Sequence, residues 1–188
     1  SRAVAGAPPP RSLWSLSLVL LAVVSFAYVG AETALTIFAV PWAMLVGREA
    51  SVGQFAISTL WFGLLAGRLG MLVVRRPLGA GFLALSGAAS AAVLGAAIAC
   101  DVTRVELAML LAGIALGAVY PVLIGLAGAR FPEASGTAAG LVAGAGALGG
   151  FVVPWLAGEL GDARGLRVAV LGVALLSLLL AGAAAALR

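Results

Sequence analysis

Long apolar runs follow one another along the chain, separated by short clusters of charged, proline or glycine residues. A helix of about 20 apolar residues spans the hydrocarbon core of a bilayer, and each run reaches that length. The pattern predicts six transmembrane helices. Their expected bounds are residues 14–45, 51–74, 78–100, 105–129, 135–160 and 166–187. Residues 1–12, with three consecutive prolines, are expected to form a linker or loop, and residues 13–188 to form the bundle.

Composition agrees with an all-α membrane protein. Apolar residues make up 63% of the chain and charged residues 10%, against about 25% charged in soluble domains. Every basic residue is Arg, and the arginines form no basic face, so nucleic acid is not an expected partner. Seven of the eleven fall at the termini and in the second and fourth connections, which predicts that both termini are cytoplasmic. The absence of Lys indicates a GC-rich, bacterial coding sequence and hence an inner membrane.

The sequence contains few of the residues from which most enzyme active sites are built. There is no His and a single Cys, Cys100, so neither a metal centre nor a catalytic triad is expected, and no cofactor is predicted. Residues 144–149 match the dinucleotide-binding pattern G-x-G-x-x-G, but they lie in an apolar run with no strand before them. The glycines of this run recur every four residues, which predicts close helix packing instead. They are Gly136, Gly140 and Gly144 in one row and Gly146 and Gly150 in another.

One charged residue lies deep within an expected span. Glu32 is the single charge between Arg11 and Arg48, and an ionisable group there costs about 2.5–3.5 kcal/mol on insertion scales. It should therefore face a cavity or a partner. Residues at helical spacing on the same face are Ser25, Tyr28, Glu32 and Thr36. We interpret this stripe as the lining of a substrate or proton path; the alternative is a hydrogen-bonded carboxyl that pins two helices together.

A second polar stripe is expected on the span over residues 51–74. It consists of Gln54, Ser58, Trp61 and Arg68. Amide, hydroxyl and indole groups suit a hydroxyl-rich solute, although interhelical hydrogen bonds would use the same groups. In the fourth span Tyr120 offers another hydroxyl, and the adjacent Pro121 predicts a local break in the helix.

The two halves of the chain echo each other. Gly30-Ala31 in the first span is similar to Gly117-Ala118 in the fourth, so residues 13–100 and 103–187 are expected to form two three-helix repeats. An odd number of helices in each repeat inverts the second copy in the membrane, as in secondary transporters.

Several motifs in order resemble the C-terminal six-helix half of a major facilitator superfamily transporter, most similar to the fucose and glucose permease branch. They lie at residues 28–33, 67–70, 117–121 and 149–162, with Arg75 and Arg76 after the second. The resemblance implies half of a secondary active transporter that moves a small solute by alternating access, coupled to protons, with sugars as one candidate class. It also implies that Arg68, Arg75 and Arg76 take part in conformational switching.

A half-transporter needs a partner. The start at Ser favours a fragment whose N-terminal six-helix half is missing, and the alternative is a natural half that pairs with a second copy of itself. Two functions of another class remain open: a non-transporting membrane scaffold and a channel-like homo-oligomer. Saturable, gradient-driven uptake would favour the transporter, whereas uptake linear in concentration would favour a pore.

Overall fold

The computed structural model describes residues 15–74 and 77–188, and every regular element in that part of the chain is a helix. The elements are α1 (Leu16–Leu45), α2 (Ala50–Gly70), α3 (Ala80–Ala99), α4 (Val105–Leu116), α5 (Val119–Arg130), the 3-10 helix η1 (Pro132–Ala134), α6 (Ser135–Arg164) and α7 (Leu166–Ala185). The helices α4 and α5 follow each other as one broken span. The prediction of six helices long and apolar enough to cross a membrane is confirmed.

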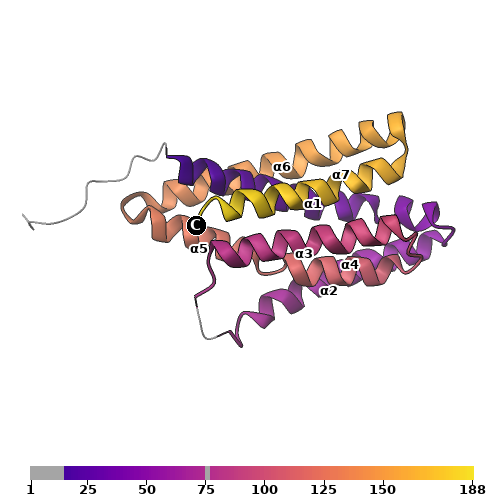
Figure 1. The fold of residues 1–188 in the computed structure, drawn as a ribbon, viewed down its shortest axis with the longest axis horizontal. Helices are drawn as coiled ribbons and strands as arrows, with labels where there is room; N and C mark the ends of the chain where they lie inside the picture. The colour runs from indigo at the N-terminus through magenta and orange to yellow at the C-terminus, as the bar shows by residue number, and fades with distance from the viewer. Residues whose placement is uncertain (1–14, 75–76) are drawn as a thin grey trace, which may run out of the picture.

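The spans run back and forth between two ends of an elongated bundle (Figure 1). The start of α1, the α2–α3 and α5–α6 connections and the C-terminus lie at one end, and the other three connections lie at the opposite end. Large apolar side chains cover the outside, among them Leu85, Phe151 and Leu175. Such a surface suits lipid, because hydrocarbon tails solvate these side chains as well as a protein interior does.

Helices distant in the sequence make the most extensive contacts. The three leading pairs are α1 with α6, α2 with α4, and α3 with α7, followed by α1 with α7. Consecutive helices pack less closely, and α2 and α3 barely touch. The core therefore depends on long-range pairing rather than on helical hairpins.

Glycine allows the closest of these contacts. A Cβ on Gly63 or Gly67 of α2 would collide with the carbonyl oxygens of Leu110 and Ile114 in α4. Gly113 of α4, and Gly117 directly after it, face the carbonyls of α2 in the same way. Backbones can approach this far only where no side chain intervenes.

The predicted packing role of the α6 glycines is half correct. Gly146 and Gly150 lie against Ser25 and Val29 of α1, as expected for close packing. The second row consists of Gly136, Gly140 and Gly144, and a Cβ on any of these would meet nothing within 4 Å. Within the described residues, that row leaves an open strip on α6.

The helices depart most from the predicted bounds at three places. The fifth span continues to Arg164, four residues beyond its predicted end at residue 160, and Gly165 leaves the helix at φ 90°. A helix can extend into water, so the charged residues that mark the membrane surface do not mark its end. The second span stops at Gly70 rather than at residue 74. The expected single helix over residues 105–129 is interrupted between Leu116 and Val119.

Candidate functional site

The interruption between α4 and α5 exposes a backbone carbonyl. Pro121 has no N–H, so the carbonyl of Gly117, four residues earlier, loses its helical donor. Arg68 replaces that donor from α2, with its Nε 3.1 Å from the Gly117 oxygen. The break is therefore closed by a side chain of another helix. The predicted break beside Pro121 is confirmed, one turn before the proline.

Tyr120 begins the first turn of α5 and meets Tyr28 of α1. Their ring centroids are 6.0 Å apart and their planes differ by 28°, which is a stacked arrangement. Tyr28 is 2% exposed and Tyr120 is half-buried. Aromatic pairs of this kind contribute about 0.5–1.5 kcal/mol beyond their buried area. The two predicted hydroxyls of the first and fourth spans thus belong to one site.

Two charged side chains lie beside this pair. The Tyr28 hydroxyl is close to the Glu32 carboxyl and the Arg68 guanidinium, yet it is buried without a hydrogen-bond partner. Glu32 is half-buried one turn further along α1, and it forms no ion pair with Arg68. We call Tyr28, Glu32, Arg68 and Tyr120 the tyrosine cluster. It brings together α1, α2 and α5 next to the helix break.

The rest of the α1 stripe is used differently. Ser25 is buried with its hydroxyl facing Gly146 of α6, and it has no hydrogen-bond partner. Thr36 donates to the Glu32 carbonyl at 2.9 Å, and Thr33 donates to Val29 in the same way. These threonine hydroxyls are therefore satisfied within their own helix. The tyrosine cluster contains Tyr28 and Glu32, while Ser25 lies at the α1–α6 seam.

The predicted α2 stripe points outward. Gln54 and Ser58 are exposed, and Trp61 is 49% exposed. Arg68 is also exposed, but it donates to the Gly117 carbonyl and its guanidinium lies close to the Tyr28 hydroxyl. It is therefore the member of this stripe that belongs to the tyrosine cluster. Arg75 and Arg76 lie outside the described residues.

Several polar contacts were not predicted. Thr59 of α2 donates to the Glu106 carbonyl at 2.8 Å, and Glu106 lies in the first turn of α4. A carboxylate is favoured there by the helix dipole. Ser90 of α3 and Ser177 of α7 form a buried pair with their oxygens 3.2 Å apart. A serine in an apolar span does not by itself predict such a pair, because its hydroxyl can equally donate to a backbone carbonyl of its own helix.

Arginines join the helix ends at both faces of the bundle. Arg48, after α1, donates to the Thr103 carbonyl just before α4. Arg130, at the end of α5, donates to Ser17 at the start of α1 and to the Leu187 carbonyl. Arg167 and Asp101 form an ion pair between α7 and the α3–α4 connection. Each of these contacts links segments more than 50 residues apart in the sequence.

Fold and site together define a six-span helical membrane protein with two tyrosines, a carboxyl and a guanidinium gathered beside a broken helix. Among the described residues, no three His, Cys, Asp or Glu side chains gather as a metal ion would require. Neither a protein-family model nor a curated protein matches the chain.

Proposed function

We propose that this chain is one half of a secondary active transporter of the major facilitator type, moving a small solute by alternating access with proton coupling. The observation that carries the proposal is Glu32, a half-buried carboxyl beside Tyr28, Arg68 and the α4–α5 break. Ionisable groups within spans serve substrate or proton pathways by default. Sugars are a candidate class, since the tyrosine cluster combines aromatic faces with hydrogen-bonding groups.

The helix packing supports an inverted pair of three-helix repeats. If spans one to three are exchanged with spans four to six, α4 takes the place of α1 and α2 takes the place of α6. The α1–α6 contact then becomes the α4–α2 contact, and these are the two most extensive contacts in the bundle. The α3–α7 pair maps onto itself. Ser90 and Ser177, which meet in that pair, are 87 residues apart, and Gly30 and Gly117 of the sequence echo have the same separation.

Two contacts at the helix ends are also exchanged when the two halves of the chain are exchanged. Arg48 joins the end of the first span to the start of the fourth, and Arg130 joins the end of the fourth span to the start of the first. The two contacts lie at opposite ends of the bundle. Inverted-topology repeats place equivalent contacts on opposite faces of the membrane, so this arrangement favours the proposal.

The partner is a second six-helix half or a second copy of this chain. The two most exposed spans are α2 and the span containing α6, with 28% and 22% of their most apolar windows buried. They carry the outward Gln54, Ser58 and Trp61 on one side and the open glycine strip on the other. Both features suit helix–helix association better than lipid.

Glu32→Gln tests the proposal in the assembled transporter. Glutamine keeps the shape and hydrogen-bonding capacity of the side chain but cannot carry the proton. We expect normal insertion and retained solute exchange, with loss of accumulation driven by a pH gradient, measured as radiolabelled uptake into proteoliposomes.

The matched control is Glu159→Gln, which removes an exposed carboxyl near the end of α6 and should leave accumulation unchanged. If Glu32→Gln accumulates solute against a gradient as well as the parent, Glu32 is not the coupling group. Uptake that stays linear in solute concentration would instead favour the channel-like oligomer.

A further inference from the structure

A cavity of about 340 Å³ opens between α2 and α3. These helices are consecutive but barely touch, and α4 packs behind the space that they leave. The cavity runs from Val74, after the end of α2, to Ala118 at the α4–α5 break. Its volume falls within the range of small-ligand sites, about 300–1,000 Å³. None of the residues of the tyrosine cluster lines it.

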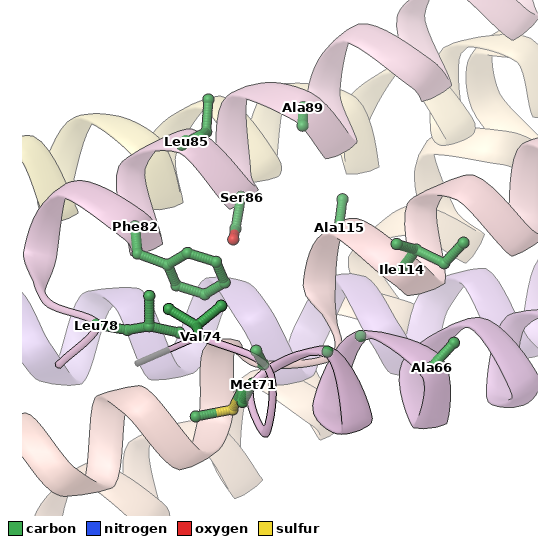
Figure 2. Close-up of a pocket in the computed structure, with 13 residues that line it drawn as sticks. Ala66, Met71, Val74, Leu78, Phe82, Leu85, Ser86, Ala89, Ile114 and Ala115 are labelled. Atoms are coloured by element: carbon green, nitrogen blue, oxygen red, sulfur yellow. The ribbon is translucent and has the colours of Figure 1, made fainter. Parts of the chain in front are cut away.

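The lining of this cavity is almost entirely hydrocarbon. Figure 2 shows the Phe82 ring of α3 directed toward Val74 and Leu78, with Met71 below them. The one polar side chain is Ser86, whose hydroxyl points into the same space. Cavities with apolar walls exclude water and take up apolar guests. The chemistry therefore selects an alkyl chain rather than a polar solute.

The mouth of the cavity is continuous with the lipid-facing surface. Leu72 and Val73, in the chain segment that borders the opening, are 82% and 81% exposed, and Leu85 on α3 is 68% exposed. Leu85 lies within the α3 span and contacts lipid tails in a bilayer, while Leu72 and Val73 follow the end of α2 and leave an apolar edge at the end of the span. An alkyl chain can thus reach Ser86 sideways from the membrane without crossing water.

We propose that the α2–α3 cavity is a lipid site, in which one acyl chain of a bilayer phospholipid enters between α2 and α3 and extends toward Ala118. The proposal rests on the membrane location of the helices and not on transport. The occupant fills the space that the missing α2–α3 contact leaves, so it acts as packing for the open side of α2.

Photolabelling in bilayers tests the site at single residues. The chain is reconstituted with phosphatidylcholine that carries a diazirine at the end of one acyl chain, irradiated and mapped by mass spectrometry. Leu179 of α7, which is exposed and does not line the cavity, reports ordinary surrounding lipid. Ser86, which is 4% exposed, should be labelled as strongly as Leu179, because the acyl chain lies inside the cavity.

Filling the cavity should abolish the internal label. Ala89→Phe on α3 places a ring in the space, and because an apolar guest needs the empty volume we expect labelling of Ser86 to fall about tenfold or more while Leu179 is unchanged. Ala92→Phe, which adds the same ring at an exposed position on α3, should change neither. Ala115→Leu fills the cavity from α4 and provides the second variant if the first lowers the thermal midpoint.

Three results would overturn the lipid site. The first is labelling of Leu179 without Ser86 in the parent chain, and the second is labelling of Ser86 that both filling variants leave intact. The third is labelling of Ser86 in the isolated chain that disappears when the chain is assembled with a partner half or a second copy, since the occupant would then be protein.

Discussion

Tyr28 carries a hydroxyl in an unusual setting. It is buried without a hydrogen-bond partner, although a carboxyl and a guanidinium lie close to it. An unsatisfied buried polar group costs about 1–3 kcal/mol, and the Glu32 carboxyl and the Arg68 guanidinium are the neighbours that can offset this cost. A hydroxyl held beside charged residues in this way is suited to binding a solute hydroxyl.

Tyr28→Phe separates the two roles of this side chain. The ring stack on Tyr120 remains, so we expect an unchanged or raised thermal midpoint. Solute affinity should fall by roughly two- to tenfold, as expected for one net hydrogen bond. Thermal unfolding in detergent and equilibrium solute binding to the assembled transporter measure the two effects. A large drop in midpoint with unchanged affinity would show that the hydroxyl is structural.

Single residues also mark the limit of the sequence prediction. The helical spacing placed Ser25, Tyr28, Glu32 and Thr36 on one face, and Tyr28 and Glu32 do join the tyrosine cluster. Ser25 instead faces α6, and Thr36 donates to its own helix. Spacing fixes the direction of a side chain only to within a quarter-turn or so, and it does not reveal whether a hydroxyl is already satisfied by the backbone.

At the level of the elements, the α4–α5 break was predictable, but the residue that supplies its missing hydrogen-bond donor was not. Pro121 removes a backbone donor wherever it occurs in a helix, so an unpaired Gly117 carbonyl follows from the sequence alone. That Arg68 supplies the donor depends on how closely α2 and α4 approach. The glycines at positions 63, 67, 113 and 117 allow this approach, but nothing local in the sequence pairs them with one another.

A double-mutant cycle tests the link between Arg68 and the break. Arg68→Ala leaves the Gly117 carbonyl unsatisfied and should destabilise the chain by about 1–3 kcal/mol. Pro121→Ala restores an N–H to that carbonyl, so the effect of Arg68→Ala should be smaller in this background. We expect a coupling of about 1–2 kcal/mol from denaturant unfolding in mixed micelles.

Arg164 provides the control for that cycle. It is exposed in the last turn of α6, and Arg164→Ala should show no coupling to Pro121→Ala. Additive effects of Arg68→Ala and Pro121→Ala would mean that the hydrogen bond to Gly117 adds nothing to the stability of the break.

For the whole molecule, the sequence predicted the number of spans and their alternating course, because each apolar run is a local signal. It could not predict which helices pair. The contacts of α1 with α6 and of α2 with α4 join segments far apart in the chain. The glycines in these contacts can be recognised as packing residues only once the positions of the helices are known.

The single cysteine offers a direct test of orientation. Cys100 is exposed at the end of α3, on the opposite side of the bundle from the C-terminus. If both termini are cytoplasmic, Cys100 faces the outside. A membrane-impermeant maleimide should then label it in intact cells without permeabilisation.

Ser135→Cys in a Cys100→Ser background is the matched control. Ser135 is exposed at the opposite end of the bundle, at the start of α6, and should be labelled only after the membrane is opened. The reverse pattern of labelling would place the termini outside and contradict the arginine bias on which the orientation rests.

The hydrogen bond from Arg68 to Gly117 ties movement at the break to hydration. A free carbonyl cannot be left without a donor in dry hydrocarbon, where its desolvation costs several kcal/mol. Arg68 can therefore leave only when another donor arrives, and water is the donor at hand. Bending of α5 against α4 becomes inexpensive when water reaches the break and remains costly while the break is dry. The same contact that closes the helix thus makes its bending depend on whether water reaches the break.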